Sequence, residues 1–261
     1  MLDVYTRAEI VTSSREHILQ NELGGRWSTV ELIGRETNNL FGSTIDAALG
    51  RAALWIRVLL DAKSGDGHSP PSMRIGDVNI MNGGKPERHP KVTVTEDPEQ
   101  GTVTIVGYAR HEQELRRLTK LLRRKYKIRE DTIPKGIRPE HEFIKPIQFA
   151  FRIDPPALRG VAKAACNLFA LHQRDVFLRD DFNGVRSFIL GEDTDGSSFV
   201  SPNTSPVAIG LRGRDMGLLD HLVCVRGEAE LGRVRALVCL FKHVQFIVEL
   251  VPHAAKRRLA A

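Results

Sequence analysis

Apolar residues recur along the chain with two different periods, and these periods predict a mixture of helices and strands. A spacing of three or four residues predicts helices at 38–60, 110–127 and 157–171. Alternation, or a concentration of β-branched residues, predicts strands at 75–80, 92–95, 102–106, 147–153, 207–211, 221–227, 233–241 and 244–251. The predicted fold class is therefore α+β.

Near the N-terminus, two short apolar arms flank a pair of glycines. Ile18 and Leu23 precede Gly24-Gly25, and the run from Val30 to Ile33 follows. Adjacent glycines between apolar runs favour a hairpin turn, because glycine adopts positive φ angles readily. The predicted order of this segment is strand, turn, strand, helix.

Stretches rich in glycine, serine and proline indicate how the chain divides. Residues 63–90 predict long loops around at most one short strand, and prolines break the chain again near 134–139. We expect an N-terminal module at 1–62, a loop-rich segment with a hairpin and a basic helix at 63–139, and a C-terminal α+β region at 140–261. With 261 residues, the chain is long enough for one large or two small domains.

The apolar runs, the N-terminal residues and the cysteines indicate in which cellular compartment the protein is expected. No apolar run approaches the length of a membrane span, and the first residues lack the pattern of a secretory signal. The three cysteines are widely spaced in apolar surroundings, which predicts buried free thiols in a reducing compartment and no structural zinc. We expect a cytoplasmic protein without membrane association; the sequence leaves its oligomeric state open.

Positive charge is concentrated in one segment. The net charge is +6, and residues 110–127 alone carry eight basic and two acidic side chains. A helix this rich in arginine and lysine suits contact with nucleic-acid phosphates, although a solvated helix face is the alternative. The candidate nucleic-acid contacts are Arg116, Arg117, Lys120, Arg123, Arg124 and Lys125.

Candidate chemistry lies elsewhere, in the segment around the glycine pair. Glu16-His17 precedes the turn, and Asn38-Asn39 stands at the predicted helix start. Phosphodiester hydrolysis needs a base and hard oxygen ligands for a divalent cation, and these residues supply both. Plainer roles are open too: asparagine suits a helix cap, and acidic-histidine pairs recur at 140–141 and 220–221.

The spacing of these residues resembles a known family. Glu16-His17-Ile18, Leu23-Gly24-Gly25 and Asn38-Asn39-x-x-Gly42-x-x-x-Asp46 together resemble the ββα-metal core of bacterial HNH endonucleases. The resemblance covers residues 16–46. It implies an N-terminal ββα-metal module within a larger α+β chain.

The resemblance also implies roles for individual residues. His17 would be the general base, with Thr29 in the place of the asparagine that orients it. Glu16 and Asn38 would hold one Mg²⁺ or Mn²⁺, and Asn39 would replace Asn38 if the register shifts by one. Asp46, about one turn beyond Gly42 on the predicted helix, is expected either to support the site by accepting a hydrogen bond from a basic residue or to face solvent.

Three departures from the family pattern accompany this resemblance. Gly34 and Thr37 occupy the places of zinc-binding cysteines, and Gln20 stands where a proline is usual. The resemblance therefore predicts a metal-dependent endonuclease that hydrolyses DNA, in bacterial defence, held together by packing alone. The alternative is a degenerate HNH-like protein that binds nucleic acid or another partner without cleavage. Whether the partner is DNA or RNA stays open.

The second half carries one further echo of the family. The pattern Arg159-x-x-Ala-Lys163-x-Ala-x-Asn167 resembles a helix found in the second half of such proteins, and it has no assigned function. We expect Lys163 to bury its aliphatic stem and expose its charged head, as most lysines at partly buried positions do.

Overall fold

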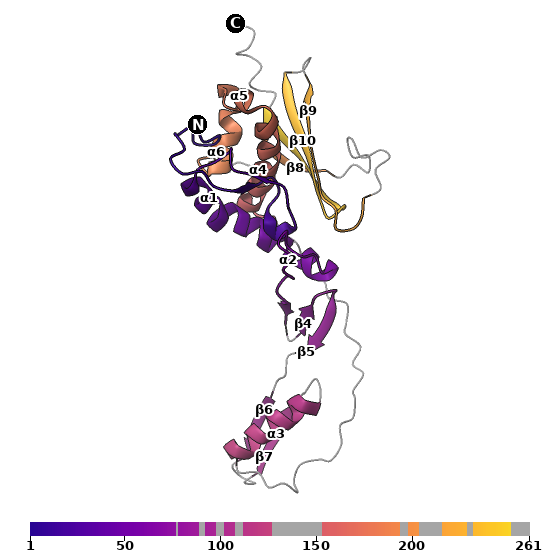
Figure 1. The fold of residues 1–261 in the computed structure, drawn as a ribbon. Coiled ribbons are helices and arrows are strands. Elements are labelled where there is room, and N and C mark those ends of the chain that lie inside the picture. Colours follow the sequence, from indigo (N-terminus) through magenta and orange to yellow (C-terminus); the bar gives the residue numbers. More distant parts are fainter. Residues whose placement is uncertain are drawn as a thin grey trace. The chain divides into compact units, whose positions relative to one another are not determined.

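The computed structural model describes residues 1–76, 78–88, 92–97, 102–107, 112–126, 153–193, 198–203, 216–228 and 232–251. Helices and strands are mixed in these residues, which confirms the α+β class (Figure 1). Two predicted strands cannot be compared with the structure: 207–211 lies outside the described residues, and so does all of 147–153 except Ile153.

The chain forms two compact units. The first contains residues 1–71, 82–84 and 151–261, and the second contains 72–81 and 85–150. This division differs from the three predicted ranges. The reason is helix α4 (Pro155–His172), which was assigned to a separate C-terminal region but packs against the helices of residues 42–60.

The predicted helix at 38–60 forms, but it is longer and contains an irregular turn. It begins as α1 (Arg35–Phe41), passes through a π-helical turn, η2 (Gly42–Asp46), and continues as α2 (Ala47–Leu60). Its N-cap is Gly34, so the capping role considered for Asn38-Asn39 is wrong. A π-helical turn holds one more residue than an α-helical turn and so rotates the residues that follow.

The two arms around the glycine pair are shorter than predicted. Strand β1 (Glu16–His17) pairs antiparallel with β2 (Ser28–Thr29), and η1 (Asn21–Leu23) fills part of the connection. Gly24 has a φ of +100°, as the turn requires. Gly25 is needed for another reason: a Cβ there would stand 1.8 Å from the Leu19 carbonyl oxygen.

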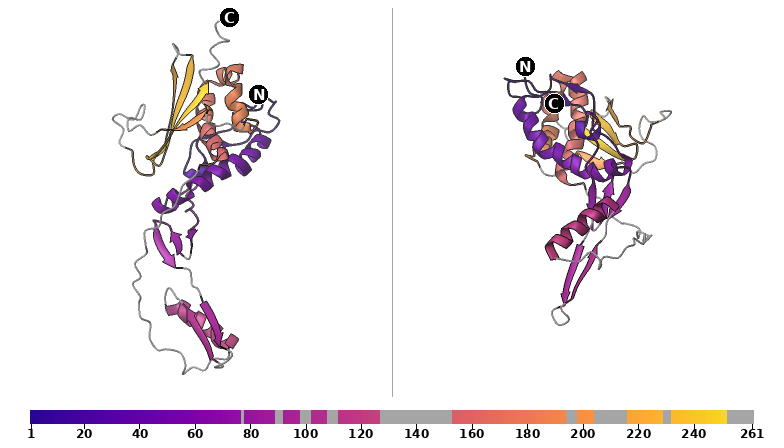
Figure 2. Two further views of the ribbon diagram at one scale, coloured as in Figure 1. Left: turned by 180° about the vertical axis from the view of Figure 1, so that it is seen from behind. Right: turned by 60° about the horizontal axis from the view of Figure 1, so that its bottom comes forward.

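Helix α4 is the central element of the first unit. It packs on α2 and η2 on one side and on an antiparallel sheet on the other (Figures 1 and 2). Asp154 caps its start by accepting a hydrogen bond from the Ala157 N–H. The strand order across this sheet is β8 (Val200–Pro202), β11 (Val244–Val251), β10 (Arg233–Leu240), β9 (Leu222–Glu228).

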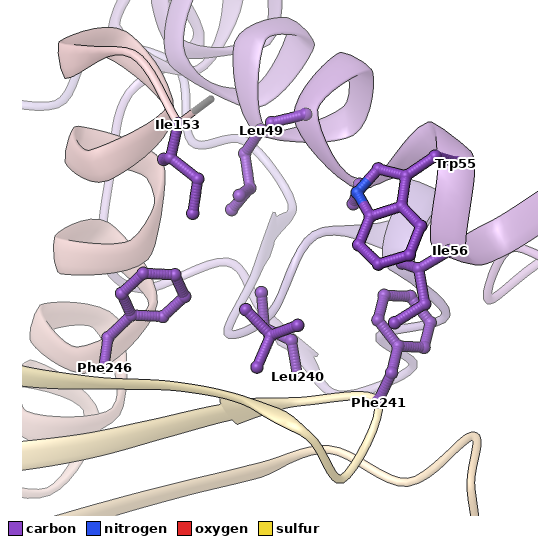
Figure 3. A pocket seen from close by; sticks show the side chains of 10 residues that line it. Leu49, Trp55, Ile56, Ile153, Leu240, Phe241 and Phe246 are labelled. Carbon is purple, nitrogen blue, oxygen red and sulfur yellow. The ribbon is translucent and has the colours of Figure 1, made fainter. Parts of the chain in front are cut away.

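The rest of the first unit completes an apolar core. Helices α5 (Arg174–Phe177) and α6 (Asn183–Leu190), joined by η4 (Asp180–Phe182), pack close to α4. Between α2 and the β10–β11 turn, Leu49, Trp55 and Phe246 line an apolar pocket (Figure 3). Its volume of about 10 Å³ is about the room for one water molecule, so this pocket does not offer a ligand site.

The three cysteines are free. Cys166 and Cys239 are buried as predicted, whereas Cys224 is only partly buried. Among the described residues, no helix is both long enough and apolar enough to cross a membrane.

The second unit contains more strand than the sequence indicated. Residues 63–90 were predicted as loops around at most one strand, but they contain an antiparallel sheet of β3 (Met73–Ile75), β4 (Val78–Met81) and β5 (Lys85–Arg88). The glycines that suggested loops close its hairpins, since Gly76, Gly83 and Gly84 all have positive φ. The predicted hairpin and basic helix are present as β6 (Val92–Asp97), β7 (Thr102–Gly107) and α3 (Glu112–Tyr126).

His221 hydrogen-bonds both the β10–β11 turn and Leu23, just before the glycine pair. These bonds lead us to expect that the stability of the fold depends on pH. Its Nε2 bonds the Leu23 carbonyl at 2.9 Å, and Nδ1 accepts the Phe241 N–H at 3.3 Å, so the neutral ring is required. Burial lowers its pKa below the ordinary 6.5. The unfolded chain therefore binds a proton first as the pH falls, and we expect the free energy of unfolding to fall below pH 6.5.

Urea unfolding at a series of pH values above and below 6.5 measures this dependence. His221→Gln should reduce it, whereas the same change at the exposed His68 should preserve it. An equal slope in wild type and His221→Gln would contradict the prediction.

Candidate functional site

The pairing of β1 with β2 decides which side chains share a face. Glu16 lies opposite Thr29, and His17 lies opposite Ser28. Residues directly opposite each other in an antiparallel pair project to the same side, and neighbours along a strand project to opposite sides. Glu16 is accordingly buried, at 2% exposure, while His17 is partly exposed. The acidic residue and the histidine therefore point away from each other.

Glu16 is held by two side chains of helix α4. The ammonium of Lys163 donates to Glu16 Oε1 at 2.6 Å, and the amide of Asn167 donates to the same oxygen at 2.7 Å. Lys163 and Asn167 are four residues apart, which places them on one face of the helix. Two donors from one helix therefore fix this carboxylate in the interior.

Asp46 completes the arrangement from the opposite side of Lys163. Its Oδ2 accepts a second bond from the Lys163 ammonium at 2.8 Å, and its Oδ1 accepts the Gln20 amide at 2.7 Å. The bond from a basic residue that the sequence predicted for Asp46 is thus present. Asp46 is the last residue of the π-helical turn, whose rotation of the helix places it here.

The cluster of Glu16, Asp46, Lys163, Asn167 and Gln20 is an ionic core, and we use that name for it below. Burial opposes the charge on Lys163, but the two carboxylates outweigh it and raise the lysine pKa. Burial also raises the pKa of Glu16, and Lys163 offsets part of that increase. Removing one partner would leave the others charged and desolvated, which is far costlier than removing an exposed pair.

Two further bonds fasten the ionic core to the rest of the unit. The Tyr5 hydroxyl donates to Asn167 Oδ1, and the amide of Asn167 also donates to the His17 carbonyl at 3.0 Å. The ring of Phe41 lies 5.5 Å from the Lys163 ammonium. The prediction that Lys163 exposes its head is wrong, because both its stem and its ammonium are buried.

His17 and Thr29 do not form the predicted pair. Thr29 lies on the Glu16 side, and its hydroxyl accepts the Glu31 N–H at 3.2 Å, so Ser28 is the residue that shares a face with His17. His17 Nδ1 is buried and has no hydrogen-bond partner in the described part of the chain. The predicted orientation of the base by Thr29 is therefore corrected by the register.

Asn38 and Asn39 differ in their surroundings. The Asn38 amide donates to Ser14 Oγ at 2.7 Å and to the Arg15 carbonyl at 3.3 Å, which ties α1 to the chain before β1. Asn39 is exposed, and its carbonyl accepts the Ser43 hydroxyl. Among the described residues, no hydrogen bond joins Asn38 or Asn39 to Glu16, and the Asn38 side chain is engaged by Ser14 and Arg15 instead.

A divalent cation at Glu16 does not fit the residues present. Glu16 Oε1 already accepts two hydrogen bonds, and a second cation beside the Lys163 ammonium would be repelled. Within the described ranges, no group of three or more histidine, cysteine or acidic side chains is arranged to hold a metal. We derive no reaction step through a metal at this position.

Sequence reasoning missed most of the ionic core. Gln20, Lys163 and Asn167 were not among the predicted site residues, and neither was Tyr5, which bonds Asn167. The signal for two of them was visible, since Lys163 and Asn167 belong to the pattern that had no assigned function. A lysine and an asparagine at helical spacing on an otherwise apolar helix indicate buried polar contacts, because such side chains are rarely buried unpaired.

Helix α3, in the second unit, carries the candidate nucleic-acid contacts. At helical spacing, Arg116, Arg117, Lys120, Arg123 and Arg124 share one side, which we call the basic stripe. All but Arg123 are exposed, and Arg123 is partly so. Lys125 is exposed but projects from another side. Leu118 and Leu122 are partly buried on the side opposite the stripe.

Comparisons with protein-family models, with curated proteins and with solved structures found no match for this chain.

Proposed function

We propose that this protein binds nucleic acid through helix α3 and does not hydrolyse it at Glu16. The observation that carries the proposal is the basic stripe, five arginine and lysine side chains on one side of a single helix. Such a row of positive charges neutralises phosphates and releases their counterions on binding. Phosphate contacts position a nucleic acid without reading its sequence, so we expect binding with little sequence preference.

The ionic core supports the absence of cleavage. The carboxylate that the family resemblance assigns to the metal is neutralised by a buried lysine from α4. The histidine assigned as base projects from the other face of β1. This arrangement favours a degenerate HNH-like protein over an active one.

A metal-dependent endonuclease is the second candidate, and one observation favours it. His17 is partly exposed, and its buried Nδ1 makes no hydrogen bond among the described residues. Proton transfer, the role that the resemblance implies, would therefore use the other ring nitrogen, Nε2. Cleavage by this route would need oxygen ligands other than Glu16.

One experiment separates the two candidates. The full chain is mixed with supercoiled plasmid in Mg²⁺, Mn²⁺ or EDTA, and binding to a short labelled duplex is measured over a range of salt concentrations. We expect binding that weakens with salt and no metal-dependent cutting. Cutting that needs metal and disappears in a folded His17→Ala variant would establish the endonuclease instead. Absence of binding at low salt would overturn both candidates.

A further inference from the structure

We infer that the Lys163 ammonium is the resident cation of the Glu16–Asp46 carboxylate pair and occupies the place of a divalent metal ion. The inference concerns the ionic core alone and does not depend on whether the protein binds nucleic acid. It follows from two features: the geometry around the ammonium and the charge of the cluster.

The ammonium bridges the two carboxylates as a metal ion would. It lies 2.6 Å from Glu16 Oε1 and 2.8 Å from Asp46 Oδ2, distances of charge-assisted hydrogen bonds. Magnesium–oxygen distances are shorter, about 2.0–2.1 Å, and calcium–oxygen distances are about 2.3–2.6 Å. A small inward shift of the carboxylates would therefore convert the lysine site into a metal site.

The charge of the ionic core favours such an exchange. Two carboxylates and one ammonium leave a net charge of −1, which the amides of Asn167 and Gln20 stabilise by donating hydrogen bonds. Without the lysine, the two carboxylates carry −2 when both are ionised, the charge that one divalent cation balances. Burial favours protonation of Glu16, so a cation competes with a proton for the emptied site, and uptake of the cation is expected at a pH that keeps both carboxylates ionised.

A neutral amide lies beside Asp46 but does not complete the pair. Gln20 is 5% exposed and its amide nitrogen bonds Asp46, while its Oε1 is buried and makes no hydrogen bond to Lys163 or to any other described residue. An ion in place of the ammonium would therefore be held by the two carboxylates and by water. The Asp46 side chain is 22% exposed, which gives a hydrated ion a route to the site.

The test truncates the lysine and offers cations in its place. The melting temperature of Lys163→Ala is measured in EDTA, in Mg²⁺, Mn²⁺ or Ca²⁺, and in methylammonium, which restores the missing head group. Lys163→Met is the matched control, because its side chain fills the space without a charge. Wild type is measured under the same conditions.

We expect a saturable rise in the melting temperature of Lys163→Ala with a divalent cation, a smaller rise with methylammonium, and none in wild type or Lys163→Met. If Lys163→Ala fails to fold in EDTA, refolding with the cation should restore it. A folded Lys163→Ala that ignores every cation would overturn the inference, as would a variant that fails to fold in all conditions. Saturable stabilisation of wild type would also overturn it, because Lys163 would then not fill the site.

Discussion

Replacing Lys163 with methionine should lower the free energy of unfolding by about 3–5 kcal/mol, the usual cost of removing one partner from a buried ion pair. Methionine matches the length of the lysine stem, so the loss reflects Glu16 and Asp46 left without their cation, not a cavity. Urea unfolding followed by circular dichroism measures the change. Lys63→Met, at an exposed lysine in the same unit, should stay within about 0.5 kcal/mol of wild type.

A second substitution separates the charge from the packing. In Lys163→Met/Glu16→Gln, the carboxylate that lost its partner is replaced by a neutral amide of the same shape. We expect this double variant to be more stable than Lys163→Met alone, because residues in contact are strongly non-additive. A loss in Lys163→Met no larger than that of Lys63→Met would contradict the assignment of the ionic core as a stabilising element.

Neutralising the basic stripe should weaken nucleic-acid binding on the order of a hundredfold at 0.1 M salt. The variant combines Arg117→Gln, Lys120→Gln and Arg124→Gln, three exposed members of the stripe. Each lost phosphate contact should also reduce the slope of log affinity against log salt by about 0.9. Fluorescence anisotropy with a labelled duplex over a salt series measures both quantities.

The same helix provides the control. Lys125→Gln removes the same charge as any one of these three substitutions, but from a side of α3 away from the stripe, and it should change the slope by much less than about 0.9. If Lys125→Gln weakens binding as much as any single stripe variant does, net charge and not the stripe determines binding. If the triple variant binds like wild type, α3 is not the binding surface.

The elements that depend on local pattern were predicted well from the sequence. The basic helix, the hairpin at 92–107 and strands β9, β10 and β11 appear close to their predicted ranges. These segments have long periodic patterns, which determine an element without reference to distant residues. In residues 72–88 only one strand, at 75–80, was predicted where three are present, because short strands joined by glycine turns have too few residues to show a period.

The contacts within the candidate site were harder to predict from the sequence, because they depend on strand register and on residues far apart in the chain. Glu16 and His17 face opposite sides because they are neighbours in a strand, so the alternation of side chains separates the predicted metal ligand from the predicted base. The pairing of Thr29 with Glu16 depends on the length of the segment that connects β1 to β2. That segment contains a 3-10 helix, which the spacing of apolar residues does not reveal. The partner of Glu16 lies 147 residues away, and no local pattern identifies it.

The bond between Glu16 and Lys163 also sets an order of events during synthesis. Ribosomes add about 5–20 residues per second, so Glu16 waits roughly 7–30 s before the 147 residues up to Lys163 have been made. Until then its carboxylate has no cation, and the apolar residues around it have no helix to cover them. Residues 1–60 therefore cannot complete their fold during that time and remain exposed to chaperones and proteases. They become protected only when α4 leaves the ribosome and packs against them.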